Sequence, residues 1–84
     1  MELPGYKKIL ELDQIKYGSY VRWFSKGKLR KGMFVCDIII TDDGIIIKGK
    51  TYNGKFINIK FDILYQKMSN DEILINHFLN NDNI

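Results

Sequence analysis

The stretch GSYVRWFSKGKLRKGMFVCDIIITDDGIIIKGKTYNGKFINIKF, residues 18–61, decides the fold of this 84-residue chain. Apolar runs of strand length alternate in it with glycine-bearing turn sequences at 25–28, 42–44 and 53–54. The whole chain contains 14 Ile and no Ala, so its composition lacks the best helix former and is rich in a β-branched residue. The stretch therefore predicts a meander of four strands joined by three hairpin turns.

The register at the third turn follows from side-chain alternation, because a slip of one residue sends every side chain to the opposite face. A three-residue loop with Gly54 in the left-handed conformation pairs Thr51 with Lys55. It also puts the apolar residues of both strands on one face, in the pairs Ile45–Phe61, Ile47–Ile59 and Gly49–Ile57. A two-residue Asn53-Gly54 loop would set Lys60 opposite Ile47, so we reject it.

For the second turn, a two-residue Asp43-Gly44 loop pairs Ile40 with Ile47 and sets Asp37 opposite Lys50 on the outer face. The inner apolar face then continues through Ile38 and Cys36 to Phe34.

For the first turn, a two-residue Lys26-Gly27 loop sets Trp23 opposite Arg30 and Val21 opposite Gly32. A longer loop would bring two arginines together, which favours the shorter one.

The two ends of the chain lack the strand-and-turn pattern of its middle. In residues 1–17, Ile9, Leu12 and Ile15 recur at a spacing that fits either a short helical turn or a covering strand. A one-turn connector and a brief last strand follow Phe61. Ser69-Asn70-Asp71-Glu72 is a capping box, and it predicts an amphipathic helix over 69–80 whose apolar face carries Ile73, Leu74, His77 and Phe78.

Together these elements predict one mainly β domain over residues 1–84. A covering segment (1–17) precedes a five-stranded SH3-like small barrel (18–67), and the C-terminal helix (69–80) closes one end of the barrel. In order and length of elements the chain looks like a barrel of the Tudor or KOW sort.

A more specific resemblance lies in Gly18-Ser19-Tyr20-Val21-Arg22-Trp23-Phe24 followed by Lys28-Leu29-Arg30-Lys31-Gly32. This segment resembles a G-x-Y-[VI]-R-[WY]-F … R-x-G-G pattern of small barrel domains encoded by large DNA viruses, although Met33 departs from the second glycine. The resemblance implies a structural or interaction component of a viral assembly, located in the cytoplasm or the virion.

Residues for catalysis are scarce, so we predict no enzyme, no cofactor, no metal and no small-molecule substrate. The single Cys36, expected to point inward, excludes a disulfide framework and a cysteine-rich zinc site. His77 reads as a half-buried helix residue, no phosphate-binding glycine motif is present, and Asp42 and Asp43 are explained by their turn. The start MELPGY has no leader pattern and no apolar run nears the roughly 18 residues of a membrane span, so an intracellular protein without a membrane partner is expected.

The formal charge of +3 conceals a polarised chain. Residues 16–60 hold ten Lys or Arg and three acids, a local charge of +7, whereas residues 68–84 sum to −3. Basic side chains interleaved with Trp23 and Phe24 are typical of nucleic-acid contact, although lysine is also common on strand edges to block edge pairing. The candidate phosphate-binding residues are Arg22, Lys26, Lys28, Arg30, Lys31, Lys48 and Lys50.

The registers also place large apolar side chains on the outer face of the sheet: Met33, Val35, Ile39, Ile46 and Phe56. A chain of this size does not leave such a patch in water, so its own ends or a partner chain must cover it. We therefore expect a protein-binding or assembly module, self-association included, with nucleic-acid binding through the basic first hairpin as the alternative. The aromatics Tyr20, Phe24, Tyr52 and Phe56 are not expected to form one cage for a methylated side chain.

Overall fold

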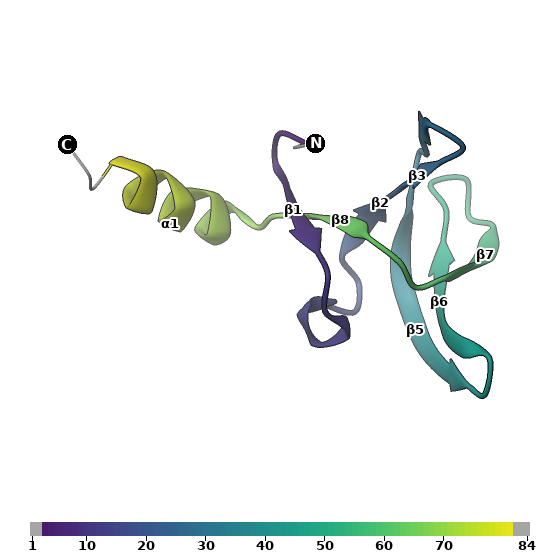
Figure 1. Ribbon diagram of the computed structural model, residues 1–84. Helices are drawn as coiled ribbons and strands as arrows, with labels where there is room; N and C mark the ends of the chain where they lie inside the picture. Colours follow the sequence, from purple (N-terminus) through teal and green to yellow (C-terminus); the bar gives the residue numbers. More distant parts are fainter. Residues whose placement is uncertain (1–2, 82–84) are drawn as a thin grey trace.

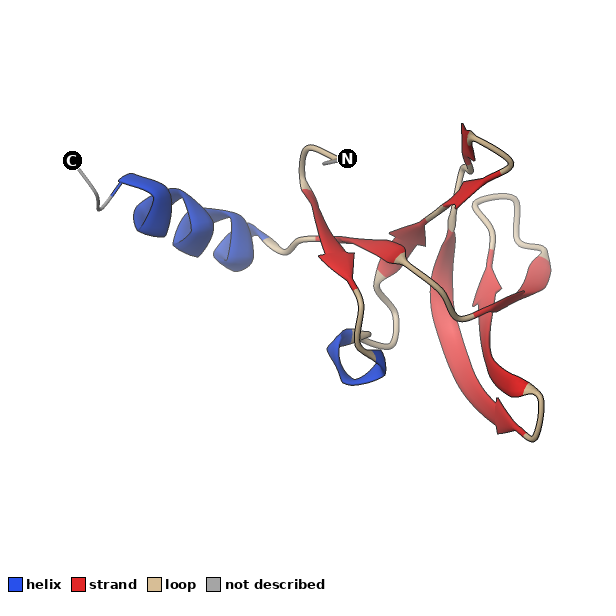
Figure 2. Ribbon diagram, viewed as in Figure 1, coloured by secondary structure: helices blue, strands red, loops and turns tan. Residues whose placement is uncertain are grey.

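A computed structural model describes residues 3–81 of the chain, with side-chain surroundings up to residue 75. Its elements are β1 (Tyr6–Ile9), the 3-10 helix η1 (Leu12–Gln14), β2 (Tyr20–Arg22), β3 (Phe24–Ser25), β4 (Lys28–Leu29), β5 (Met33–Thr41), β6 (Gly44–Lys50), β7 (Phe56–Lys60), β8 (Leu64–Lys67) and α1 (Asn70–Asn81). The prediction of a mainly β chain with a C-terminal helix is confirmed (Figures 1 and 2).

The strands form one antiparallel sheet in the order β1-β8-β2-β5-β6-β7, with β3 and β4 as a separate two-stranded ribbon. Five strands of the sheet were expected; the sixth, β1, comes from the N-terminal segment, and the sheet is open at β1 and β7. This segment was expected to form either a short helical turn or a covering strand. It forms both, because strand β1 is followed by the single helical turn η1.

Two of the three turns are confirmed where they were predicted. Lys26 and Gly27 have φ of 52° and 75°, the left-handed pair that a two-residue hairpin turn requires. Gly54 has φ 85° in the three-residue loop, and the Thr51 amide donates to the Lys55 carbonyl at 2.7 Å. The inner pairs Ile47–Ile59 and Gly49–Ile57 follow from that loop.

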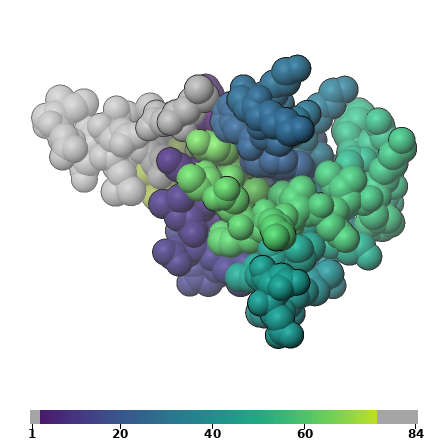
Figure 3. Space-filling model, turned by 45° about the vertical axis from the view of Figure 1, so that its right-hand side comes forward, coloured from purple at the N-terminus to yellow at the C-terminus, as the bar shows by residue number. Residues whose placement is uncertain are grey.

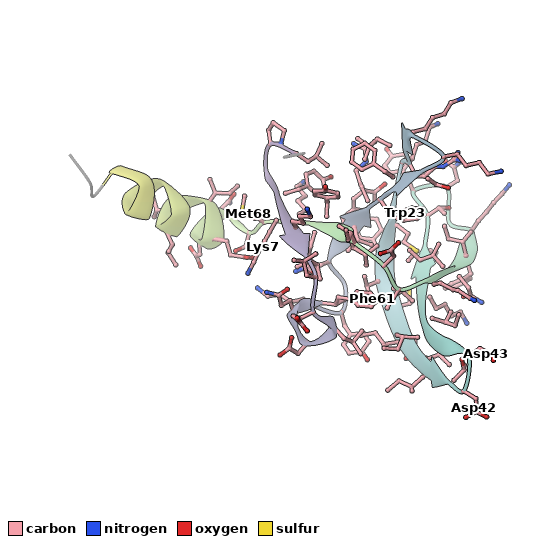
Figure 4. All side chains as sticks on the ribbon, in the orientation of Figure 1. Lys7, Trp23, Asp42, Asp43, Phe61 and Met68 are labelled. Carbon is pink, nitrogen blue, oxygen red and sulfur yellow. The ribbon has the colours of Figure 1, made fainter. Side chains whose placement is uncertain are left out.

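The prediction for the second turn is wrong by one position. Thr41 pairs with Gly44, so the turn residues are Asp42 and Asp43, and the Thr41 hydroxyl closes the turn by donating to the Gly44 carbonyl at 2.8 Å. Ile40 therefore faces Ile45 instead of Ile47. The tip of this hairpin projects from the body of the molecule, where Figure 4 shows both aspartates (Figures 3 and 4).

A β-bulge at Cys36 changes which side of β5 faces the core. Val35 pairs with Gly49 and Asp37 with Lys48, so Cys36 is an extra residue without a partner. Its presence inverts the alternation of everything before it, and the expectation that Cys36 points inward is also wrong, since the thiol is exposed. Asp37, which lies between the bulge and the turn, is opposite Lys48 and not opposite Lys50 because of the shifted turn.

The inversion corrects the predicted outer face. Met33 and Val35 are 0% and 2% exposed in the core, whereas Phe34, expected inside, is 44% exposed. Gly49 makes this packing possible, because a Cβ there would overlap the Met33 sulfur. A similar correction holds at the first hairpin, where Val21 pairs with Met33.

The hydrophobic core contains side chains from the meander and from strands β1 and β8. Its fully buried side chains are Ile9, Val21, Met33, Ile47 and Leu64. The N-terminal segment also contributes Ile15, so this end of the chain covers the Met33 and Val35 side of the sheet. Gln66 on β8 ties the segment down, since its amide nitrogen donates to the Gln14 carbonyl at 3.1 Å and its oxygen accepts from the Lys16 amide at 2.9 Å.

The C-terminal helix starts as predicted but does not close the sheet. The Ser69 amide donates to the Glu72 carboxylate and the Glu72 amide donates to the Ser69 hydroxyl, both at 3.2 Å, so the capping box is confirmed. Helix α1 then projects away from the strands (Figure 1), and Ile73 and Leu74 are 44% and 58% exposed. The side chains of His77 and Phe78 lie outside the described residues.

Candidate nucleic-acid interface

A row of side chains crosses the outer face of the sheet. Tyr20 on β2 pairs with Phe34 on β5, Phe34 pairs with Lys50 on β6, and Lys50 pairs with Phe56 on β7. Paired residues place their side chains on the same face, and neighbouring strands lie about 4.8 Å apart, so this aromatic–lysine row is about 14 Å long. The bulge at Cys36 creates the row, because it turns Phe34 outward.

The aromatic members of the row are accessible. Phe34 and Phe56 are 44% and 59% exposed. The edge of the Tyr20 ring meets Phe34 with 4.8 Å between centroids and 70° between planes, which holds Phe34 in position. Two ammonium groups lie near Phe56, that of Lys48 at 5.2 Å and that of Lys50 at 5.7 Å from the ring centroid.

The lysines of β6 make no ion pair within the part of the chain that the structure describes. Among residues 3–81 the structure shows one ion pair, between Lys16 and Glu72, with 3.2 Å between nitrogen and oxygen. Asp37 lies opposite Lys48 in the register, but its carboxylate accepts from the Ile38 amide at 2.8 Å. The two lysines of β6 are thus available to an external anion.

A cavity of about 340 Å³ lies beside the row, between Tyr20 and the β6–β7 loop. Its lining includes Lys31, Tyr52 and Lys55 beside Tyr20. Tyr52 is 85% exposed on the β6–β7 loop. The sequence places Tyr52 far from Tyr20, and the structure corrects this, since both line one cavity, whereas the Phe24 ring contacts Tyr65 at 5.7 Å.

The predicted basic residues fall into separate places. Lys48 and Lys50 flank Phe56, and Lys31 lines the cavity next to Tyr20. Lys26 and Lys28 belong to the β3–β4 hairpin, apart from the main sheet.

The two predicted arginines lie next to each other. Arg22 Nε donates to the Arg30 carbonyl at 2.8 Å. Phosphate contact by the predicted basic residues stays a prediction. Of these residues, Lys48 and Lys50 lie near the Phe56 ring, and Lys31 lines a cavity with Tyr20 and Tyr52.

Of the predicted protein interface, Met33 and Val35 are wrong because both are buried. Ile39 (37% exposed) and the half-buried Ile46 face each other on the outer surface, one row beyond Lys48, and Phe56 belongs to the aromatic–lysine row. Trp23 packs partly against the core instead of joining the row (Figure 4).

Sequence reasoning missed Phe34 and Tyr6 as accessible aromatics. Side-chain alternation without a bulge predicts Phe34 in the core. Tyr6 belongs to a segment without a clear period, and it lines a cavity of about 510 Å³ beside Tyr20 and Phe34.

Within residues 3–81 no three His, Cys, Asp or Glu side chains gather in a way that would hold a metal ion. The helices in that part of the chain are too short or too polar to cross a membrane. Comparison of the chain with protein-family models, with curated proteins and with solved structures found no match.

Proposed function

We propose that this chain is a non-enzymatic module that binds single-stranded nucleic acid through the outer face of its sheet. The observation that carries the proposal is the aromatic–lysine row, in which Lys50 lies between the exposed rings of Phe34 and Phe56 on adjacent strands, with the ammonium group of Lys48 also near Phe56. Flat rings accept unstacked bases whatever their sequence, and lysines neutralise the phosphates between them.

The exposed rings favour a single strand over a duplex. A base stacks on a side chain only when it has left its neighbours in a helix, which bases in a single strand do at small cost. Phe34 and Phe56 lie two strands apart, about 10 Å, with Lys50 between them. This spacing lets two bases stack on the rings while the phosphates between them meet the β6 lysines.

The same geometry weakens the competing expectation of a protein interface on this face. Two of its five residues, Met33 and Val35, are in the core. The residues that remain outside are interspersed with unpaired lysines, a composition typical of a surface that binds an anion and not of the dry centre of a protein interface.

We also propose that the sheet has the strand arrangement of an SH3-like barrel. The order β8-β2-β5-β6-β7, with the last strand of the sequence next to the first strand of the meander, supports this interpretation. Strand β1 would be an addition to that arrangement, paired to β8.

The test is binding of a fluorescein-labelled 20-mer of deoxythymidine, measured by fluorescence anisotropy. Phe34→Leu and Phe56→Leu keep apolar bulk and lose the ring, whereas Phe34→Tyr and Phe56→Tyr keep the ring. Stacking is worth about 1–3 kcal/mol per base, so we expect each leucine variant to bind about tenfold more weakly and each tyrosine variant to bind as the parent does.

Salt dependence identifies the phosphate contacts. Removing Lys48 and Lys50 together by alanine substitution should make the slope of log K against log salt shallower by about 1.4, because each contact to a single strand contributes about 0.7. The matched control is the alanine pair at Lys7 and Lys8, exposed lysines of β1 at the other edge of the sheet. Undetectable binding at low salt, or leucine variants that bind as well as the parent, would overturn the proposal.

The first hairpin is the alternative route for the nucleic acid. Alanine at Lys28, Arg30 and Lys31 together would remove most of the affinity if the strand followed that hairpin. With the row as the site, we expect this triple variant to retain stacking on Phe34 and Phe56 and to lose only the contribution of Lys31.

A second candidate function, docking onto another protein, is favoured by α1. This helix projects away from the sheet (Figure 1) and exposes three large apolar side chains, Ile73 (44%), Leu74 (58%) and Ile75 (58%). Analytical ultracentrifugation of the parent and of Leu74→Lys tests its self-associating form: a concentration-dependent dimer lost in the variant supports it, and a monomer in both contradicts it.

A further inference from the structure

A cavity of about 510 Å³ lies where β1, β2 and β5 meet the β8–α1 junction. Its walls carry three aromatic rings, Tyr6, Tyr20 and Phe34, and its charged side chains are Lys16, Lys67 and Glu72. Tyr20 and Phe34 are also members of the aromatic–lysine row. The cavity is therefore the continuation of the row toward the start of α1, the region around Met68 in Figure 4.

The lining suits a nucleotide. A volume of this size is within the usual range for small-molecule sites, about 300–1,000 Å³. Aromatic walls accept a planar base, and Lys67 can attract its phosphate, whereas Lys16 is paired with Glu72. Tyr6 adds a ring that the open row lacks, since in the cavity a base lies between side chains instead of on top of one.

Glu72 is the carboxylate among the residues that line this cavity. Its Oε1 accepts from the Ser69 amide and from Lys16 Nζ, both at 3.2 Å. The Ser69 side chain also hydrogen-bonds this carboxylate, which keeps acceptor capacity for a ligand because an ionised carboxylate offers about four lone-pair sites. The Ser69 amide, and after it Lys16, hold the pKa of the Glu72 carboxyl below its usual value, which keeps the group ionised and acceptor-only.

We propose that the cavity takes one nucleotide of the bound strand, with Glu72 selecting a base that carries an exocyclic amine. The proposal rests on the proposed function. Cytosine, adenine and guanine each offer an amine to a carboxylate, as in the contact of Glu or Asp with cytosine N4. Thymine and uracil offer one N–H between two carbonyl oxygens, and those oxygens face the negative charge.

The test compares 20-mers of deoxycytidine and deoxythymidine, which have the same ring size, by anisotropy. The parent should prefer deoxycytidine about tenfold. Glu72→Gln keeps a capping-box residue and removes the charge, so the preference should fall to about twofold or less while binding of deoxythymidine persists. Asp71→Asn is the matched control, with the same charge change on an α1 residue that does not line the cavity, and should keep the preference.

A second measurement needs no variant. Cytidine 5′-monophosphate added to the isotope-labelled parent should shift the amide resonances of Gly18, Ser19 and Ser69, which line the cavity, and uridine 5′-monophosphate should shift them less.

Equal binding of the two oligonucleotides by the parent, or an unchanged preference in Glu72→Gln, would overturn the base-selecting cavity and leave the row intact as a binding site. Failure to bind either oligonucleotide at low salt would overturn the row and the cavity together.

Discussion

Replacing Met33 and Phe34 by alanine, one at a time, tests the bulge at Cys36, because the two side chains lie on opposite faces of β5. Met33 is 0% exposed and Phe34 is 44% exposed. A regular strand with Phe34 inside would reverse these environments. The ranking of the two variants therefore reports directly on the extra residue in the strand.

The expected magnitudes differ clearly. Removing a fully buried methionine costs about 2–5 kcal/mol of unfolding free energy. Phe34→Ala loses an exposed ring and one edge contact to Tyr20, a contact of the kind worth about 0.5–1.5 kcal/mol. A domain of 84 residues has a total stability of about 4–12 kcal/mol, so the Met33 variant loses a large share of it.

Urea unfolding followed by the fluorescence of Trp23, which packs against the core, measures both variants. With a slope of about 1.5 kcal/mol per molar urea, a loss of about 3 kcal/mol lowers the midpoint by about 2 M, and the Phe34 variant should shift by less than about 1 M. Met33→Leu conserves volume and should lose less than about 1.5 kcal/mol. A larger midpoint loss for Phe34→Ala than for Met33→Ala would refute the bulge.

Three further outcomes are expected. Gly49→Ala should cost about 1–3 kcal/mol in urea unfolding, because its Cβ would overlap the Met33 sulfur; a neutral substitution contradicts this packing. The Glu72 carboxyl has its pKa below the usual 4.5 in the folded chain, so its contribution to the start of α1 is present above pH 4.5 and is lost as the pH falls through the lowered value; circular dichroism should show an acid limb that Glu72→Gln lacks. Gln66→Leu leaves the Lys16 amide without its acceptor, and hydrogen exchange at that amide should accelerate while stability drops by about 1–3 kcal/mol; unchanged exchange would argue against the tether.

Local patterns in the sequence predicted the features that depend on neighbours in the chain. The Lys26-Gly27 turn, the Gly54 loop and the capping box at Ser69 each involve residues within a few positions, and the structure confirms all three. Their physical causes, left-handed glycine and side-chain capping of amides, act wherever those residues occur.

The bulge was out of reach of alternation alone. Cys36 has no feature that distinguishes it from a regular strand residue. Whether Met33 is buried depends on what packs beside it, and those residues come from other parts of the chain. One available signal was Gly49, since a glycine inside a strand marks a bulge or a close approach of another group. Placing Met33 against Gly49 would have predicted that Met33 faces the core and Phe34 faces outward.

The candidate site combines residues that sequence reading ranked separately. Lys48 and Lys50 were identified from the charge pattern, but the ring beside them in the row, Phe34, depends on the bulge. Tyr6 and Glu72 come from opposite ends of the chain and share a cavity only because β1 pairs with β8, directly before α1.

The pairing of β1 with β8 also determines how the protein responds to mechanical tension. Tyr6 lies opposite Lys67, and the Met68 amide donates to the Gly5 carbonyl at 3.0 Å, so the chain enters β1 and leaves β8 at the same end of the ladder. A pull on the two termini loads these hydrogen bonds one after another, as in unzipping, instead of all at once in shear. The first strand to peel away carries Tyr6 with it, so traction on the termini would open the wall of the cavity before the rest of the sheet yields.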